Sequence, residues 1–196
     1  MVQKKDIIDA ILMASGFSKR FGKENKLLVN FNGKPLARHT LELVCNLSCH
    51  FNKIFLVANE NKVCDLAYDL PVTIIRNENP ERGQRESIRL GVKESNANYY
   101  MFFPCDQPLL NSETVESILE KRKEGFIVQP SFNGKVGNPA LFSNYFRDSL
   151  INLAEGECGR DIKKKYPNRI ITIEVKREEV LLDIDKPEIL HKILNI

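Results

Sequence analysis

Short apolar runs alternate with segments of helical character along most of the chain. The first run extends from Ile7 to Met13 and is interrupted by Asp9. Continuous apolar runs of this length are typical of strands buried on both faces, and their alternation with helices indicates an α/β fold. The pattern therefore predicts a mainly parallel sheet covered by helices on both faces. The expected strands are residues 7–13, 53–58, 72–76, 99–103, 126–130, 135–142 and 169–175, with a short extended piece at 27–31.

Proline and glycine mark the boundaries between these elements. Pro35 suits the first turn of a helix, where its missing N–H costs no helical hydrogen bond, and this helix is expected to continue to about Asn46. Asn133-Gly134 has the signature of a hairpin turn, which should lead into the strand at 135–142. Further helices are expected at 82–95, 112–125 and 143–153, shortly after Gly159, and from Pro187.

Composition fits a water-soluble globular protein of one domain, residues 1–196, with 42% hydrophobic and 28% charged residues. The net charge of +3 is too weak to indicate nucleic acid or a membrane surface as a partner, so any anion site must be local. No apolar run approaches the roughly 18 residues of a membrane span. The first apolar run precedes a basic, glycine-containing loop, which favours a strand over a signal peptide and leaves the cytoplasm as the expected location.

Cysteine and histidine offer little for a metal cluster or a nucleophilic triad. The five cysteines are an odd number without a C-x-x-C pair, and reduced thiols are the simplest interpretation, with Cys45 and Cys49 expected to be small buried residues of a helix rather than metal ligands. The three histidines are scattered along the chain. Zinc chemistry and a Ser/His/Asp triad are therefore not expected.

A glycine-containing basic loop, residues 14–22, follows the first expected strand. Glycine allows backbone N–H groups to face an anion, and Arg20 and Lys26 add positive charge where a triphosphate commonly binds in such folds. The spacing is neither a Walker motif nor G-x-G-x-x-G, which disfavours P-loop ATPases and dinucleotide dehydrogenases. Taken alone, one glycine pair with three charges would favour a basic surface loop over a phosphate site.

The full pattern resembles the signature of MobA-like NTP transferases, because residues 12–26 read Leu-Met-Ala-Ser-Gly-x-Ser-x-Arg-Phe-Gly-x-x-x-Lys. Members of that family have a Rossmann-like, three-layer sandwich of the nucleotide-diphospho-sugar transferase type. The resemblance implies that the loop wraps the triphosphate, that Arg20 and Lys26 are catalytic, and that Lys26 lies near the α-phosphate. Ser15 replaces the alanine that is usual there. The implied nucleotide-binding residues of this loop are Ala14, Ser15, Gly16, Arg20 and Lys26.

Asp106 lies between prolines at the end of an apolar strand, in Pro104-Cys105-Asp106-Gln107-Pro108. Ligands of open α/β sheets bind beyond the carboxyl ends of strands, and Mg²⁺ prefers a few carboxylates together with phosphate oxygens. A helix-capping or turn aspartate would have a similar local sequence. The resemblance to the metal-binding Asp-x-Pro of the family implies that Asp106 is catalytic and binds Mg²⁺.

The segment from Gly83 to Gly91 places glycine and small polar groups at a helix start, where the backbone can approach a base or ribose; a helix with a solvated basic face would look similar. The segment resembles the Gly-x-x-x-Ser of cytidylyl-transferring relatives and lacks the Gly-Pro-Leu-Ala-Gly type of guanylyl-transferring ones. The resemblance implies nucleotide contacts from Gly83, Gln84 and Ser87.

Three later segments, residues 137–142, 156–160 and 181–188, resemble Gly-His-Pro, Gly-Asp-x-Gly-Ala-Arg and Asp-Ile-Asp-Thr-Pro-Glu of molybdenum cofactor cytidylyltransferases. Asn138, Glu157 and Lys186 depart from those motifs, and Arg160-Asp161 is shifted against Ala-Arg. The resemblance implies that one of Asp183 and Asp185 joins Asp106 at Mg²⁺.

The resemblance implies transfer of CMP from CTP to the terminal phosphate of molybdopterin, with release of pyrophosphate and with an apo molybdenum hydroxylase as a possible later partner. Two alternatives remain. One is a nucleotidyltransferase for another acceptor, such as a sugar phosphate or methylerythritol phosphate, although residues 24–26 lack the Pro-Lys-Gln expected for the latter. The other is a non-catalytic maturation protein that binds a phosphorylated cofactor.

Overall fold

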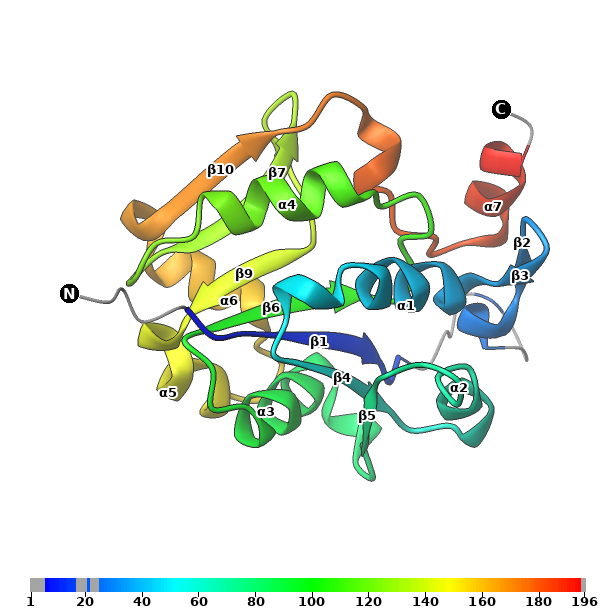
Figure 1. Cartoon of the computed structure of the whole chain (residues 1–196), viewed down its shortest axis with the longest axis horizontal. Helices are drawn as coiled ribbons and strands as arrows, with labels where there is room; N and C mark the ends of the chain where they lie inside the picture. Colours follow the sequence, from blue (N-terminus) through cyan, green and yellow to red (C-terminus); the bar gives the residue numbers. More distant parts are fainter. Residues whose placement is uncertain (1–5, 17–20, 22–24, 195–196) are drawn as a thin grey trace.

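A mixed, mostly parallel β-sheet forms the centre of the computed structural model, which describes residues 6–16, 21 and 25–194. Across these residues the strand order is β10-β7-β9-β6-β1-β4-β5, with β8 paired to β7 off this path (Figure 1). The strands of this sheet are β1 (Ile8–Ala14), β4 (Lys53–Ala58), β5 (Thr73–Arg76), β6 (Tyr99–Pro104), β7 (Ile127–Phe132), β8 (Lys135–Val136), β9 (Ala140–Ser143) and β10 (Ile170–Glu174). A separate two-stranded ribbon consists of β2 (Asn30–Phe31) and β3 (Lys34–Pro35).

Strand direction determines which loops share an edge of the sheet. β1 pairs in parallel with β4 and β6, β4 with β5, and β7 with β10. β9 is antiparallel to both of its neighbours, β6 and β7, so β7 runs in the same direction as β6. The loops that follow β1, β4, β6 and β7 therefore emerge at one edge, which is where ligands bind in open α/β sheets.

Helices cover both faces of the sheet, as the sequence pattern predicts (Figure 1). Along β1, Ala10, Leu12 and Ala14 belong to one buried cluster and Ile11 to another, because successive strand side chains point to opposite faces. The helices are α1 (Leu36–Asn46) and α4 (Ser112–Glu120) on the first face, α3 (Gln84–Glu94), α5 (Arg147–Ile151) and α6 (Gly159–Lys165) on the second, and also α2 (Asn61–Asp65) and α7 (Pro187–Leu194).

Helix boundaries follow from local chemistry. In α1, positions 36, 37, 40, 41 and 44 are buried, which is the spacing of one apolar helix face. Asn111 caps α4 by accepting a hydrogen bond from the backbone N–H of Thr114 at 2.9 Å. No helix among the described residues is both long enough and apolar enough to span a membrane.

Gly91 allows α3 to pack closely on β1. A Cβ atom at Gly91 would lie 2.6 Å from Cγ2 of Ile11. We expect Gly91→Ala to lower the free energy of unfolding by about 1–3 kcal/mol, because overpacking outweighs the gain in helix propensity. Urea unfolding would measure this effect. Gly159→Ala is the control, since its Cβ would make ordinary contacts of 3.6 Å and 3.9 Å. A Gly91→Ala protein as stable as the parent would contradict the prediction.

The structure corrects the expected strand at 135–142, which is divided into β8 and β9. The hairpin turn is confirmed, since Asn133 and Gly134 both have positive φ. β8 continues the hairpin with β7, and the N–H of Gly137 donates to the carbonyl of Pro130 in the same register, but Pro139 has no N–H with which to continue the ladder. The chain thus leaves β7 and re-enters the sheet as β9, between β6 and β7.

Other differences concern short elements. The piece at 27–31 begins with a 3₁₀ helix, Lys26–Leu28, and Pro35 ends β3 just before α1 rather than lying inside the helix. Residues 143–153 form a 3₁₀ turn, Asn144–Phe146, followed by the short α5. The pattern gave no indication of α2 or of the 3₁₀ helix Glu178–Leu181, because single turns carry too few residues to show a period.

Candidate functional site

The carboxyl ends of β1 and β6 lie side by side and bring two distant motifs together. Met13 is paired with Pro104 in the parallel register, and the N–H of Cys105 donates to the carbonyl of Met13 at 3.4 Å. Ser15 and Gly16 therefore begin their loop next to the turn that carries Asp106. The fold thus places the expected phosphate loop and the expected metal-binding aspartate at one edge of the sheet, as parallel strands require.

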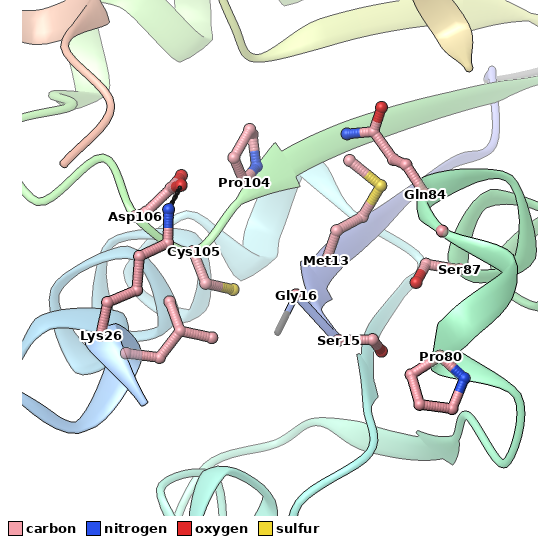
Figure 2. A pocket seen from close by; sticks show the side chains of 12 residues that line it. Met13, Ser15, Gly16, Lys26, Pro80, Gln84, Ser87, Pro104, Cys105 and Asp106 are labelled. Atoms are coloured by element: carbon pink, nitrogen blue, oxygen red, sulfur yellow. Dashed lines mark hydrogen bonds and ion pairs between the residues drawn. The ribbon is translucent and has the colours of Figure 1, made fainter. Parts of the chain in front are cut away.

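A cavity of about 300 Å³ opens at this edge (Figure 2). Lys26 and Asp106 lie at one end of it, and Gln84, Ser87 and Pro80 lie at the other (Figure 2). One end is thus charged, whereas the other is polar and uncharged. The lining residues are Met13, Ser15, Gly16, Lys26, Leu27, Pro80, Gly83, Gln84, Ser87, Pro104, Cys105 and Asp106.

The charged end is built around the ammonium group of Lys26. Lys26 begins the 3₁₀ helix that Asn25 caps, since the side chain of Asn25 accepts from the N–H of Leu27 at 3.0 Å. Its Nζ donates to Oδ2 of Asp106 at 2.5 Å and to Oδ1 of Asp185 at 2.7 Å. An ammonium group has three hydrogens, so one donor remains after these two bonds. That donor can serve an anionic ligand in the cavity.

The charge state of Lys26 follows from two opposing effects. Burial alone would lower the pKa of Lys26, but the negative charge of Asp106 and the hydrogen bonds to Asp106 and Asp185 outweigh it, and the net pKa is raised. Lys26 is therefore a cation at neutral pH. A cation at this end of the cavity favours binding of a phosphate group.

Backbone contacts of a late segment bring Asp183 and Asp185 to the site. The N–H of Ile184 donates to the carbonyl of Asp106 at 2.9 Å, and Nε2 of Gln107 donates to the carbonyl of Leu181 at 3.2 Å. Ile184 itself is fully buried in a small apolar cluster with Phe31, Leu36 and Leu190. This packing holds a carboxylate on each side of Ile184 against the turn at Asp106.

Buried carboxylate oxygens at this end fit a cation. Oδ1 of Asp106 and Oδ1 of Asp183 are buried and have no hydrogen-bond partner among the residues that the structure describes. Burial raises the pKa of Asp183 to about 7, and the charges of Asp106 and Asp185 add to the rise. Within residues 6–16, 21 and 25–194, no three His, Cys, Asp or Glu side chains are arranged to hold a metal ion by themselves. A divalent cation here would need phosphate oxygens or water as further ligands, as Mg²⁺ commonly does.

The uncharged end of the cavity comes from the start of α3 and the end of β1. Gly83 has φ 74° and ψ −162°, a conformation essentially limited to glycine, and it sets the direction in which α3 begins. Gln84 is exposed, whereas Ser87 is buried and its hydroxyl lies 3.4 Å from Nδ2 of Asn77. The hydroxyl of Ser15 donates to the carbonyl of Val57 at 3.1 Å, so it faces β4.

No atom of the described residues lies close to the position that a side chain at Gly16 would occupy. A Cβ atom at this position would meet no atom of the described residues within 4 Å, and φ of Gly16 is not positive. Neither packing nor backbone strain within the described chain therefore requires glycine here. Close approach of a ligand to the backbone would require it.

Most of the residues expected from the sequence meet in this one place. Ala14 is buried behind the cavity and does not line it, and Arg20 lies outside the described residues. The expected residues that line the cavity are Ser15, Gly16, Lys26, Gly83, Gln84, Ser87 and Asp106, and Asp183 and Asp185 lie beside its charged end.

Sequence reasoning did not assign Leu27, Pro80 or Cys105 to the site, although all three line the cavity. Their proximity to Lys26, Gly83 and Asp106 in the chain was the available signal. Burial, and then the charge of Asp106, raises the pKa of the Cys105 thiol far above its ordinary value. Cys105 therefore lines the cavity as a neutral, buried thiol and does not act as a thiolate nucleophile.

Known proteins share both the sequence pattern and the fold. Residues 10–170 match the family model of the MobA-like NTP transferase domain. A molybdenum cofactor guanylyltransferase of Shewanella woodyi is 29% identical over 187 residues, which cover 92% of each chain. A nicotine blue oxidoreductase of Paenarthrobacter nicotinovorans is 25% identical over 196 residues, with 95% of this chain and 96% of the relative covered.

Similarity of structure extends over almost the whole chain. A nucleotidyl transferase from Methanothermobacter thermautotroptrophicus superposes with a TM-score of 0.84 and 18% sequence identity, and 96% of each chain is covered. At this identity the likeness shows the fold, which is the α/β, Rossmann-like sandwich expected from the sequence. Because the family model covers most of the 196 residues and includes both loops of the cavity, the chain belongs to the MobA-like NTP transferase family and is a nucleotidyltransferase.

Proposed function

We propose that the protein transfers CMP from CTP to the terminal phosphate of molybdopterin and releases pyrophosphate. The observation that carries the proposal is the shared cavity of Lys26, Asp106 and the glycine loop, whose ends differ in charge as the ends of a nucleotide do. The guanylyltransferases among the relatives support a molybdenum cofactor as the acceptor and make GTP the competing nucleotide. A product of this kind would suit an apo molybdenum hydroxylase as the later partner.

The reaction needs little covalent help from the protein. An acceptor phosphate monoester is anionic near neutral pH, and one of its oxygens attacks the α-phosphorus of the nucleotide as the bond to the β-phosphate oxygen breaks. The electron pair of that bond leaves with pyrophosphate. Repulsion between anions opposes this step, so positioning in line and electrostatic stabilisation supply most of the rate.

Each charged residue then has a separate role. The remaining N–H of Lys26 binds an α-phosphate oxygen, and the two carboxylates hold its ammonium group in place. Backbone N–H groups of the loop at Gly16, together with Arg20, neutralise the β- and γ-phosphates. The side chains of Asp106 and of one of Asp183 and Asp185 would hold Mg²⁺, which fits the buried, unpaired carboxylate oxygens at this end. When bound, Mg²⁺ would offset negative charge on the triphosphate.

We propose that the base binds at the uncharged end of the cavity, which Ser15, Gln84 and Ser87 line. A side chain at Ser15, rather than glycine, narrows the slot and favours a pyrimidine. Hydrogen bonds from Gln84 and Ser87 to the edge of cytosine would leave polar groups unpaired with another base, which penalises the wrong nucleotide.

We expect CTP to be preferred when CTP and GTP compete at equal concentrations with molybdopterin and Mg²⁺, as measured by the identity of the dinucleotide formed. Ser15→Gly should shift the ratio toward GTP, because it removes the Cβ that crowds a purine. Ser15→Ala is the matched control: it removes the hydroxyl bonded to Val57 but keeps the Cβ, so the preference should remain. Equal incorporation, or a preference for GTP by the parent, would refute the cytidylyl assignment.

The same assay separates the alternatives. Release of pyrophosphate with a sugar phosphate or methylerythritol phosphate, but not with molybdopterin, would identify another acceptor. Binding of molybdopterin without pyrophosphate release from any of CTP, GTP, ATP and UTP would identify a non-catalytic cofactor carrier. One fold can serve different chemistries, as the relative named as an oxidoreductase illustrates.

A further inference from the structure

Gln107 is a buried polar residue next to Asp106, and the proposed reaction leaves its side chain without a role. Only 1% of its surface is exposed. Its Nε2 donates to the carbonyl of Leu181 at 3.2 Å, whereas its Oε1 is buried and has no hydrogen-bond partner among the described residues. A buried acceptor without a partner costs free energy, so this atom calls for a partner that the chain itself does not supply.

Three such oxygen atoms lie beside the charged end of the cavity. Of the four side-chain oxygens that are buried without a partner within residues 6–16, 21 and 25–194, three belong to Asp106, Gln107 and Asp183. The two oxygens of Asp106 differ, because Oδ2 accepts from Lys26 at 2.5 Å whereas Oδ1 accepts no hydrogen bond from a described residue. A group of acceptors without donors is an arrangement that fits a cation.

Contacts between these three side chains show that they are neighbours. Gln107 follows Asp106 directly, and the carbonyl that its amide contacts belongs to Leu181, two positions before Asp183. Burial, and then the charge of Asp106, raises the pKa of Asp183 to about 7. A side-chain hydrogen bond with Gln107 acts on this pKa in the opposite direction, so the amide is close to the carboxyl group. Because Nε2 and Oε1 share one amide carbon, they lie only about 2.2 Å apart.

A neutral oxygen suits this place better than a third carboxylate would. Asp106 and Asp183 already repel each other when both are charged, and an amide oxygen adds a ligand without adding charge. Carbonyl oxygens, like carboxylates and water, suit Mg²⁺ and Mn²⁺. Asp185 differs from Asp183, because its Oδ1 accepts from Lys26 at 2.7 Å.

We propose that Oε1 of Gln107 binds the divalent cation, together with Oδ1 of Asp106 and Oδ1 of Asp183. The inference rests on the proposed function, which assigns Mg²⁺ to this end of the cavity, and it adds a third protein oxygen to the two carboxylates named there. It also selects Asp183 as the second carboxylate, since Asp185 binds the ammonium group of Lys26. With three protein oxygens, the site binds a divalent cation before the nucleotide arrives.

The test measures Mn²⁺ binding to the protein alone, without nucleotide or acceptor. Mn²⁺ takes the same oxygen ligands as Mg²⁺, and electron paramagnetic resonance reports its free concentration. Gln107→Leu should raise the Kd for Mn²⁺ at least about tenfold, because even residues that only support metal ligands contribute about 10–100-fold. Gln129→Leu is the matched control and should keep the parent Kd, since Gln129 is also buried, at 4% exposure, but bonds to Lys163 on α6.

A second variant, Gln107→Glu, distinguishes a cation ligand from a residue that only anchors the chain at Leu181. Glutamate keeps an oxygen at the end of the side chain, but as a carboxylate it cannot donate to the carbonyl of Leu181. A mere anchor would be lost in both variants. As a ligand, the carboxylate should bind Mn²⁺ at least as tightly as the parent amide does.

Melting temperatures with and without Mn²⁺ make the comparison independent of the stability of each variant. A ligand that binds only the folded protein raises the melting temperature according to its Kd. Mn²⁺ should therefore raise the melting temperature of the parent and of Gln107→Glu by more than that of Gln107→Leu.

The outcomes separate this inference from the proposed function. Parent affinity of Gln107→Leu for Mn²⁺, or binding by Gln107→Glu as weak as that by Gln107→Leu, overturns the inference. A parent that binds no Mn²⁺ without nucleotide also overturns it, even when CTP, molybdopterin and Mg²⁺ yield pyrophosphate. The expected pattern of Mn²⁺ binding in a protein that releases no pyrophosphate retains the cation site and refutes the transfer reaction.

Discussion

Asp106→Asn is expected to lower kcat by at least about 100-fold, while the protein remains folded. Loss of residues that merely support metal ligands typically costs 10–100-fold, so loss of a direct carboxylate ligand should cost at least the upper value. The amide keeps the shape of the side chain but holds Mg²⁺ far less well. The fold should persist because Lys26 keeps its second partner, Asp185, at 2.7 Å. Pyrophosphate release at increasing Mg²⁺ concentrations measures the effect.

Asp65→Asn is the matched control for this variant, because Asp65 is exposed on α2 and lies outside the cavity. It should retain parent activity at every Mg²⁺ concentration. A melting temperature close to that of the parent would show that Asp106→Asn is folded. Parent turnover by folded Asp106→Asn at saturating Mg²⁺ would rule out the metal role.

Lys26→Met should lower kcat/KM by at least about 2 kcal/mol of transition-state stabilisation, or roughly 30-fold. The variant removes the ammonium group that lies between Asp106 and Asp185, and with it the donor that we propose for the α-phosphate. Methionine retains most of the apolar stem, so the effect reports the ammonium group. Initial rates with CTP and molybdopterin measure it.

Two comparisons make this result specific. Lys62→Met changes an exposed lysine on α2 and should leave kcat/KM unchanged. Lys26→Arg keeps the charge, but a planar guanidinium cannot replace a compact ammonium between two carboxylates, so partial activity is expected. Parent values of kcat/KM for Lys26→Met would show that Lys26 does not stabilise the transition state.

The strands could be predicted from the sequence because each is a distinct apolar run, as for β1 and β6. The division between β8 and β9 could not, since residues 135–142 look like one strand in sequence, whereas their pairing with β7 shifts register by two residues between β8 and β9. That shift depends on the partner strand, and strand pairing is a tertiary property. The helix α2 was missed for a different reason, because its five residues span little more than one turn.

For the site, sequence motifs identified Lys26, Asp106, Asp183 and Asp185 as candidate residues. The motifs did not show which of these side chains contact one another. The ammonium of Lys26 lies between Asp106 and Asp185, a contact over 159 positions of sequence that no local pattern encodes. The sequence likewise could not predict that the hydroxyl of Ser15 points toward the carbonyl of Val57.

The backbone hydrogen bond from Ile184 to Asp106 determines when the charged end of the cavity can form during synthesis of the chain. A nascent chain that ends before Ile184 already contains both loops of the cavity, but it lacks Asp185 and the apolar contacts that Ile184 makes with Phe31 and Leu36. Chain segments fold as they emerge from the ribosome, from the N-terminal side onward. The charged side chains around Lys26 therefore reach their final arrangement only after most of the sheet has formed, and we expect that incomplete chains do not compete with finished protein for the nucleotide.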